Sequence, residues 1–310
     1  DSRLGIIPLS GTREGLFFFA FSARARTPGT ANPSVLMPNP LSHGYVGAAV
    51  GADLDPVYLN AGADTGFLPD LEAIGADDLD RAAAFFLCSP ANPQGAVADA
   101  AYLEKAIALA RQHDFILVAD ECYSEVYTVT PPPGVLEIAQ EKTGSLANVV
   151  SMQSLSKRSN LPGLRVGFCA GDPAFVEDFA SFRNVVAPQV PLPVQHACAR
   201  LLGEESHVEA SRQLYIDKFE VADRILGDRF GYARPGGGFF LWLDVSANGS
   251  SEEVTKTLWQ RAGVRVLPGN FLARDDGSGT NPGEGFIRVA MVADLKTTED
   301  ALGRIVRTLN

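Results

Sequence analysis

The densest group of polar residues that could do chemistry is the segment 154–168, with the sequence SLSKRSNLPGLRVGF. This segment follows one predicted apolar strand and precedes another. Lys157 offers an amine that can act as a nucleophile or carry a proton, and Arg165 offers a guanidinium that can bind an anion. By itself a lysine in such a turn is more commonly a solvated surface charge, so its assignment depends on what lies beside it.

Two further polar groups also follow predicted strands. Asp120 and Tyr123 come directly after the apolar run that begins at Phe115, and Asn92 lies in the turn 89–95 after another such run. The carboxyl ends of strands in an α/β sheet are where ligands bind. The structural alternatives are that Asp120 caps a helix or turn and that 89–95 is a turn shaped by proline and glycine. Because all three groups fall at strand ends of one predicted sheet, they point to a shared site.

Alternating short apolar runs and longer helical patterns predict the sheet that would position these residues. Runs that are apolar on both faces, interleaved with helical stretches such as 100–113, are typical of a mainly parallel α/β sheet. The predicted strands span residues 6–9, 34–37, 56–59, 84–88, 115–119 and 149–152.

The pattern changes after about Gly203, which predicts a second and smaller unit. Residues 204–230 have the pattern of one long, charged amphipathic helix. Beyond it the sequence predicts strands at 238–243, 264–267 and 286–290, helices at 251–262 and 297–309, and a loop at 275–283. We therefore predict a large α/β domain at 1–205, which carries the three polar groups, and a small α+β domain at 206–310.

Composition and charge exclude several classes of protein. A chain of 310 residues with 46% hydrophobic and 20% charged residues has the composition of a two-domain globular protein. Its net charge of −11 opposes binding to nucleic acid or to an anionic membrane surface. Every apolar run is far shorter than the roughly 20 residues of a membrane span. The four cysteines lack CxxC spacing, which predicts a reduced, cytoplasmic chain without a metal site.

The three polar groups together resemble the class I/II aminotransferases of fold type I, which use pyridoxal 5′-phosphate. The matching motifs are Asn92-Pro93-x-Gly95, Asp120-x-x-Tyr123, and Ser154-x-Ser156-Lys157 followed by Arg165. The resemblance extends from about Ile6 to the C-terminus, and SKRSNLPG is similar to the N-succinyldiaminopimelate aminotransferase subgroup. It implies a mainly parallel central sheet with helices on both faces, a smaller α+β C-terminal domain and a homodimer.

The resemblance implies catalytic roles for Lys157, Asp120 and Tyr123. Lys157 would supply the amine that bonds to the cofactor aldehyde, and would then carry a proton between the substrate α-carbon and the cofactor. Asp120 would keep the ring nitrogen protonated, because an opposite charge stabilises the charged form. Asn92 and Tyr123 would donate hydrogen bonds to the phenolate oxygen of the ring.

The cofactor phosphate needs positive groups near it. Gly11, Thr12 and Arg13 lie between a predicted strand and a predicted helix, so their backbone N–H groups can point at an anion, although a plain helix cap is the alternative. The resemblance implies that they bind the phosphate together with Ser154 and Arg165. A hydrogen bond to a charged group contributes about 1.5–3 kcal/mol and a helix end only about 0.3–1 kcal/mol, so the two side chains should matter more.

Arg288 lies inside the otherwise apolar strand 286–290. A buried guanidinium is costly unless it is paired, so this residue predicts a carboxylate partner. That partner is either a protein side chain or, as the resemblance implies, the α-carboxylate of the substrate, with Asn92 beside it.

Two features depart from the family pattern. An aromatic ring usually stacks on the cofactor from the loop after strand 34–37, and the matching residue here is Ser42. His43 would then either stack in its place or lie at the surface, while Tyr45 is expected to pack against the helix that follows. The chain also begins almost at the phosphate loop, which predicts either a fragment or a shortened relative that lacks the N-terminal segment of the family.

The sequence supports three functions. The first is transamination between an amino donor, glutamate, and a keto or aldehyde acid; the subgroup implies N-succinyl-2-amino-6-oxopimelate and lysine biosynthesis. The second is β-elimination or decarboxylation with the same cofactor, because the first bond-breaking step is shared. The third is a relative that binds the cofactor without turnover. Small amino and keto acids are the expected partners.

Overall fold

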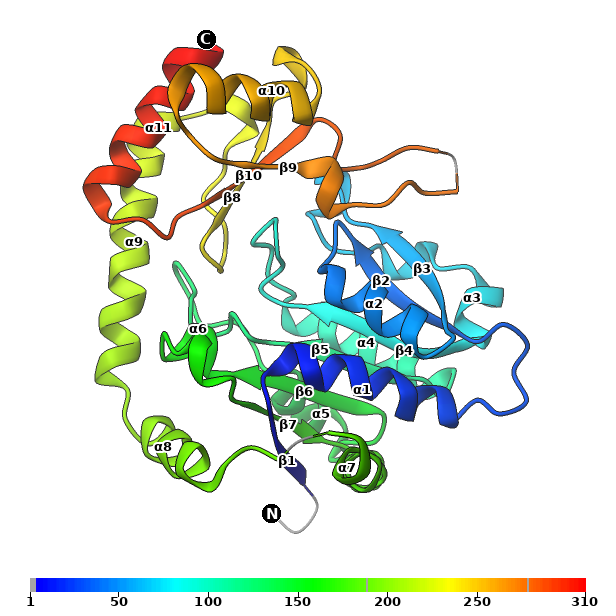
Figure 1. The fold of residues 1–310 in the computed structure, drawn as a ribbon. Helices are drawn as coiled ribbons and strands as arrows, with labels where there is room; N and C mark the ends of the chain where they lie inside the picture. Colours follow the sequence, from blue (N-terminus) through cyan, green and yellow to red (C-terminus); the bar gives the residue numbers. More distant parts are fainter. Residues whose placement is uncertain (1–3, 188, 278) are drawn as a thin grey trace.

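The computed structural model describes residues 4–187, 189–277 and 279–310 and arranges its strands in two sheets (Figure 1). The large sheet has the strand order β1-β7-β6-β5-β4-β2-β3, and the small sheet has the order β8-β10-β9. The strands of the large sheet are β1 (Gly5–Leu9), β2 (Ser34–Asn39), β3 (Asp55–Asn60), β4 (Ala82–Cys88), β5 (Ile116–Asp120), β6 (Val149–Ser154) and β7 (Gly167–Gly171). Those of the small sheet are β8 (Phe240–Asp244), β9 (Leu267–Pro268) and β10 (Phe286–Ala290).

The large sheet is mainly parallel, as the sequence predicted. Strands β3, β2, β4, β5 and β6 run parallel to one another, whereas β7 is antiparallel to both β6 and β1. Cys88 is paired with Asp120, and Asp120 with Met152, so β4, β5 and β6 end at the same edge of the sheet. The three polar groups that follow these strands are therefore brought to one place.

Helices cover both faces of the large sheet, because its central strands are buried on both sides. Phe86 of β4 points into one core and its neighbour Phe85 into the other. The first core includes residues of α1 (Thr12–Ala25), α2 (His43–Gly51) and α7 (Pro173–Val186). The second includes residues of α3 (Ala76–Asp80), α4 (Ala100–Gln112) and α5 (Val135–Thr143).

A long helix connects the two sheets. In Figure 1 the chain passes from α8 (Leu192–Leu202), beside the large sheet, into α9 (Ser206–Leu226), which runs along one side of the molecule to the small sheet. The predicted helix 204–230 ends earlier, because Gly227 adopts the left-handed φ of 57°. A third core joins α9 to the small sheet and to α10 (Ser251–Thr257) and α11 (Leu295–Leu309).

One predicted strand is wrong over most of its length. We expected a strand at 264–267, but only Leu267 and Pro268 pair with β10. Val264 and Val266 are both buried, so the alternating pattern reflects their packing and not sheet pairing. In the predicted loop 275–283 the described residues form neither helix nor strand, and residue 278 lies outside the described residues.

The domain boundary at 205/206 stays a prediction, although the two sheets lie on either side of it in the sequence. Every helix in the described part of the chain is too short or too polar to cross a bilayer.

Candidate functional site

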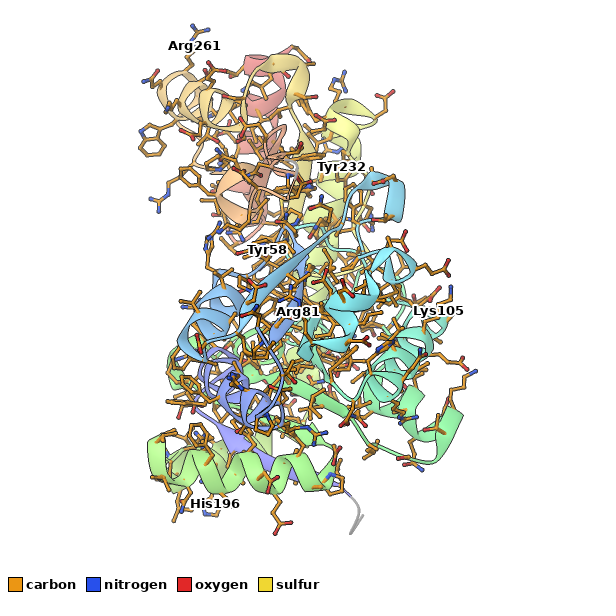
Figure 2. All side chains as sticks on the ribbon, turned by 90° about the vertical axis from the view of Figure 1, so that its right-hand side faces the viewer. Tyr58, Arg81, Lys105, His196, Tyr232 and Arg261 are labelled. Carbon is orange, nitrogen blue, oxygen red and sulfur yellow. The ribbon has the colours of Figure 1, made fainter. Side chains whose placement is uncertain are left out.

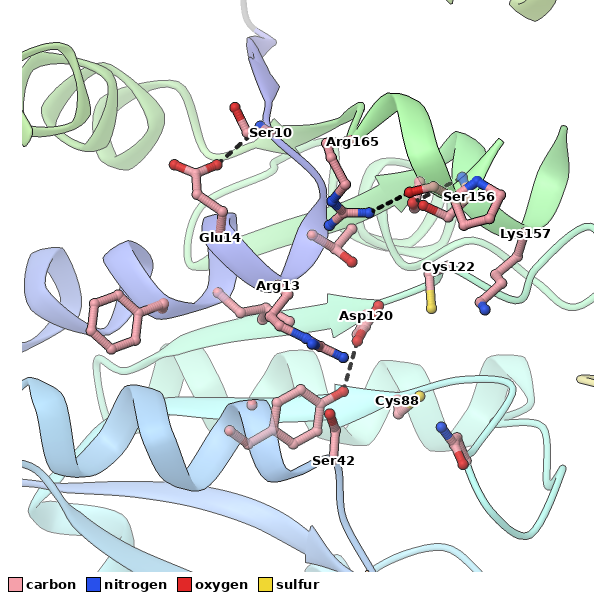
Figure 3. Close-up of a pocket in the computed structure, with 18 of the residues that line it drawn as sticks. Ser10, Arg13, Glu14, Ser42, Cys88, Asp120, Cys122, Ser156, Lys157 and Arg165 are labelled. Carbon is pink, nitrogen blue, oxygen red and sulfur yellow. Dashed lines mark hydrogen bonds between the residues drawn. The ribbon is translucent and has the colours of Figure 1, made fainter. Parts of the chain in front are cut away.

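A pocket of about 830 Å³ lies at the edge of the sheet where β4, β5 and β6 end. Almost all of the predicted site residues line it: Thr12, Arg13, Asn92, Asp120, Tyr123, Ser154, Lys157 and Arg165. The remaining two lie next to lining residues, since Gly11 is in close contact with Arg165 and Arg288 is hydrogen-bonded to Asn92. Figure 3 shows the side chains of Arg13, Asp120 and Lys157 converging on one space.

Asp120 presents an unsatisfied carboxylate oxygen to this pocket. The side chain is buried, with 7% of its surface exposed, and its Oδ2 accepts a hydrogen bond of 2.8 Å from the Tyr45 hydroxyl. Its Oδ1 is also buried but has no hydrogen-bond partner among the described residues. Burial raises the pKa of Asp120, and hydrogen bonding from Tyr45 and Cys122 opposes that change. A cationic donor placed at Oδ1 would satisfy this atom and favour the ionised form.

Tyr45 is the residue of the site that the sequence interpretation placed wrongly. We expected it to pack against the helix that follows, but it lies in the first turn of α2 itself. Its ring packs 5.3 Å from that of Phe86, and its hydroxyl reaches the end of β5. The available signal was its position just after the carboxyl end of β2, the edge at which the other polar groups collect.

No aromatic ring comes from the position at which the family places one. Ser42 is the N-cap of α2 and lines the pocket with its small side chain. His43 is exposed, and its Nε2 contacts the carbonyl oxygen of Phe271. The surface alternative therefore describes His43 better than the stacking one.

Lys157 extends from the short helix α6 (Leu155–Arg158), whose N-cap is Ser154. Its Nζ lies 4.8 Å from the centroid of the Phe239 ring and 5.9 Å from that of Tyr123. Within the described chain this amine makes no ion pair. Burial lowers the pKa of Lys157; Cys122 opposes that effect, and the positive charges of three arginines lower the pKa further: Arg13, Arg288 and Arg165.

The start of α1 and the Arg165 side chain form a cradle for an anion. Gly11 is the N-cap of α1 with φ 85°, and a Cβ at this position would collide with the Arg165 guanidinium. The first backbone N–H groups of a helix have no partner within the helix, so those of Thr12 and Arg13 are available to a ligand. Glu14 does not neutralise this positive region, because it accepts hydrogen bonds from Arg183 and from the Ser10 amide.

Arg288 lies next to the lining residues Asn92 and Tyr123. Its Nη1 donates to Asn92 Oδ1 at 3.1 Å, and Asn92 Nδ2 donates to the Tyr123 hydroxyl at 3.3 Å. Its guanidinium carbon lies 4.4 Å from the centroid of the Phe240 ring, while its Nε is buried without a partner in the described chain. Arg288 makes no ion pair with an Asp or Glu side chain among the described residues. Of the two possible partners considered above, the α-carboxylate of the substrate is the one that remains.

This set of groups fits pyridoxal phosphate. The unsatisfied Asp120 oxygen suits a protonated ring nitrogen, the cradle suits a phosphate, and the unpaired amine suits an aldehyde. A parallel sheet that carries these groups at its carboxyl edge defines a fold type I pyridoxal-phosphate enzyme.

Comparison with known proteins gives the family. The profile of the family described as aminotransferase class I and II matches residues 2–305, so the chain belongs to the class I and II aminotransferases. It is a pyridoxal-phosphate-dependent aminotransferase.

Individual relatives agree with this assignment. The chain is 31% identical to an LL-diaminopimelate aminotransferase of Nitratidesulfovibrio vulgaris, over 98% of this chain and 76% of that protein. Its fold matches an aminotransferase of Neisseria meningitidis with a TM-score of 0.94 and 37% identity, over 100% of this chain and 78% of the other. It also matches a probable N-succinyldiaminopimelate aminotransferase of Thermus thermophilus, with a TM-score of 0.85 and 26% identity, over 100% and 79% of the two chains.

Proposed function

We propose that this aminotransferase exchanges an amino group between glutamate and a keto or aldehyde acid of the diaminopimelate type, in lysine biosynthesis. The observation that carries the proposal is the unsatisfied Asp120 Oδ1 in the same pocket as the unpaired Lys157 amine. When bound, pyridoxal phosphate supplies an electron sink for the pair left behind when the substrate loses its α-proton. The protein's own residues then have to bind, orient and transfer protons.

Asp120 would hold the ring nitrogen of the bound cofactor, and Tyr45 fixes the orientation of the carboxylate through Oδ2. The phosphate would be held by the Gly11–Arg13 backbone, by Ser154 and by Arg165. Arg165 is directed toward the cradle by its Nη1, which donates to the Pro162 carbonyl oxygen at 2.9 Å. These contacts anchor the cofactor at both ends.

Lys157 is suited to move the substrate α-proton. An amine whose pKa is lowered by burial gives up its proton more readily, so its unprotonated form is available as a base nearer to neutral pH. Tyr123 and Asn92 lie beside it as donors to the phenolate oxygen. Their mutual hydrogen bond keeps both groups at that wall of the pocket.

Arg288 is placed to bind the α-carboxylate of the substrate. It has the Asn92 amide on one side and the Phe240 ring on the other, and it lacks a carboxylate partner in the described chain. A bidentate contact with a carboxylate would satisfy its buried nitrogen. We infer that Arg288 orients the substrate in the pocket.

The substrate class follows from the charge of the pocket. Arg13 lines the pocket and has neither an ion pair nor a hydrogen bond from its side chain among the described residues. An unpaired guanidinium facing the pocket favours substrates that carry a second carboxylate. Glutamate and diaminopimelate derivatives both have one, and two of the similar proteins described above are named as aminotransferases of diaminopimelate compounds.

Absorbance spectroscopy of the enzyme with pyridoxal phosphate bound, called the loaded enzyme below, tests this function. The purified chain is mixed with pyridoxal phosphate, glutamate is added, and the absorbance is followed. Conversion to the pyridoxamine phosphate form, followed by its reversal with a keto acid, supports transamination. Release of ammonia or carbon dioxide would instead show elimination or decarboxylation, and an unchanged spectrum would show binding without turnover.

A comparison of amino donors tests the substrate. Glutamate, LL-diaminopimelate and N-succinyldiaminopimelate are each added to the loaded enzyme. We expect conversion with glutamate and with at least one diaminopimelate compound, and much slower conversion with alanine, which lacks the second carboxylate. Arg13→Gln should reduce this preference. Equal rates with alanine and glutamate would contradict the proposed role of Arg13.

We also propose that the enzyme is a homodimer. Helix α8 carries no buried residue in the described chain, and Leu192 on it is 68% exposed. Figure 2 shows His196, a residue of this helix, at the end of the molecule opposite to Arg261. A helix that leaves apolar side chains uncovered is a plausible contact surface for a second copy. Light scattering measures the mass directly, and a monomer at micromolar concentration would contradict the proposal.

A further inference from the structure

Two consecutive aromatic residues, Phe239 just before β8 and Phe240 at its first position, face two half-buried cations of the site. Phe239 lies under the Lys157 amine, with Nζ 4.8 Å from the ring centroid. Phe240 lies under Arg288, with the guanidinium carbon 4.4 Å from its centroid. Both distances are within the roughly 6 Å over which a cation is attracted to the face of an aromatic ring. Each ring therefore stabilises one charged side chain of the pocket.

The Phe239 ring is held firmly in this orientation. It is buried, it stacks on Tyr215 at 5.3 Å with an interplanar angle of 18°, and it meets Tyr123 edge to face at 5.5 Å. Its backbone carbonyl accepts a hydrogen bond of 2.9 Å from the amide of Met291. Because neighbours fix both the ring and its backbone, the face that it offers to Lys157 is a permanent feature of the pocket.

An aromatic face suits an amine that has to gain and lose a proton. A carboxylate partner would stabilise the ammonium form strongly and would raise the pKa of the lysine. A ring face attracts the ammonium more weakly and has no atom that could take the proton. Within the described chain Lys157 has no carboxylate partner, so ring faces are its main contacts with charge-stabilising groups.

We propose that Phe239 is a positioning residue that holds the Lys157 amine over its ring whenever that amine is free, ready to transfer the substrate proton. This inference rests on the proposed function, because it takes Lys157 as the proton carrier. The other groups that act on Lys157 are Arg13, Arg165, Arg288, Cys122 and Tyr123. The arginines and the burial of the amine oppose its charge, and the Phe239 ring offsets part of that effect.

Fluorinated phenylalanines at position 239 test the proposal, because fluorine weakens the attraction of the ring face for a cation while nearly preserving ring shape. The full chain is freed of cofactor, and the rate at which it captures pyridoxal phosphate covalently is followed by absorbance as a function of pH. A weaker ring contact lowers the pKa of the amine, so the midpoint of the rate increase should move to lower pH. The expected shift is about half a unit to one unit for the most fluorinated ring, with smaller shifts for fewer fluorines.

The same substitution at Phe240 is the matched control, because that ring faces Arg288. It should leave the pH midpoint of capture unchanged. Phe239→Leu is a second variant without a ring face and should move the midpoint in the same direction as fluorination. A midpoint that is the same in all Phe239 variants, or that shifts equally at position 240, would overturn the proposal.

The outcomes also separate this inference from the proposed function. If Lys157→Ala still captures pyridoxal phosphate covalently with the normal spectrum, the assignment of the lysine itself is wrong. If Lys157 captures the cofactor but the pH midpoint of capture is the same in all Phe239 variants, only the positioning role of Phe239 is wrong. A matching shift in the pH profile of the pyridoxamine form reacting with a keto acid would extend the result to the proton-transfer step.

Discussion

At the residue scale, Asp120 and Lys157 are both placed where burial disfavours their charged forms. Burial raises the pKa of the acid and lowers that of the amine. A group in such an environment changes its protonation easily when a ligand brings the complementary charge. Tyr45 belongs to the same arrangement, because its hydroxyl fixes the Asp120 carboxylate.

Asp120→Asn should stabilise the cofactor-free protein at neutral pH. The pKa of Asp120 in the folded protein is raised above 3.8, so ionising it costs stability, and this cost appears as the pH rises from 3.8 through the folded-state value. The variant avoids this ionisation cost near pH 7, and the difference in the free energy of unfolding should shrink toward pH 3.8. Urea unfolding at several pH values measures it. A variant less stable than the original at neutral pH would show that the carboxylate is satisfied without the cofactor.

Tyr45→Phe should weaken pyridoxal phosphate binding about tenfold. The change removes the 2.8 Å hydrogen bond to Asp120 and keeps the ring against Phe86, and hydrogen bonds to charged groups contribute about 1.5–3 kcal/mol. Titration followed by absorbance gives the Kd. Tyr102→Phe is the control, since its hydroxyl donates to the Pro69 carbonyl away from the pocket. A similar loss of affinity in both variants would argue against a specific role of Tyr45.

At the scale of elements, the site depends on where strands end and where helices begin. The ends of β4, β5 and β6 supply three groups, and the starts of α1, α2 and α6 supply the others. The start of α1 is the most constrained of these, because Gly11 has a left-handed φ and closely approaches Arg165.

Gly11→Ala should weaken the binding of pyridoxal phosphate at least tenfold. A Cβ there would strain the backbone and displace the Arg165 guanidinium, with the loss of about 1.5–3 kcal/mol of contact with the phosphate. Gly66→Ala separates the two effects, because Gly66 also has a left-handed φ, of 64°, but nothing lies within 4 Å of a Cβ there. We expect that control to lose some stability and to keep its cofactor affinity. If the original protein, Gly11→Ala and Gly66→Ala bind pyridoxal phosphate with equal affinity, the proposed phosphate site at Gly11 and Arg165 is wrong.

Elements and motifs were predictable from the sequence where local pattern decides the outcome. The strand that ends at Asp120 is apolar on both faces and followed by a polar motif, so both its position and its edge of the sheet could be inferred. The strand expected at 264–267 was wrong, because sheet pairing depends on a partner that the local pattern does not reveal. Tyr45 and Phe239 reach Asp120 and Lys157 from distant segments, and only the tertiary structure shows those contacts.

At the scale of the whole molecule, the pocket is lined by the part of the chain that forms the large sheet, and the small sheet brings Arg288 next to it through the hydrogen bond to Asn92. Asp120 ends β5, Asn92 lies in the turn after β4 and Lys157 lies in α6, whereas Arg288 and Phe240 belong to strands β10 and β8 of the small sheet. The chain has a net charge of −11, yet the pocket gathers unpaired positive side chains. Anionic cofactor and substrates are therefore attracted locally, against the overall charge of the protein.

Pyridoxal phosphate should raise the thermal unfolding temperature of the whole chain. A ligand at about 100 times its Kd adds about 2.7 kcal/mol of stability, which for a chain of this length corresponds to about 4 °C. Pyridoxal, which lacks the phosphate, should raise it much less at the same concentration, because the Gly11 and Arg165 cradle then has no ligand. Differential scanning fluorimetry compares the two compounds. Equal shifts for both would show that the cradle does not bind phosphate.

Chemical mapping of the attached cofactor tests the central claim most directly. The loaded protein is treated with borohydride, which makes the bond between cofactor and lysine permanent, and its peptides are analysed by mass spectrometry. We predict the phosphopyridoxyl group on Lys157 alone, and no attachment in Lys157→Ala. Attachment to a different lysine, or none in the unmodified protein, would contradict the site described here.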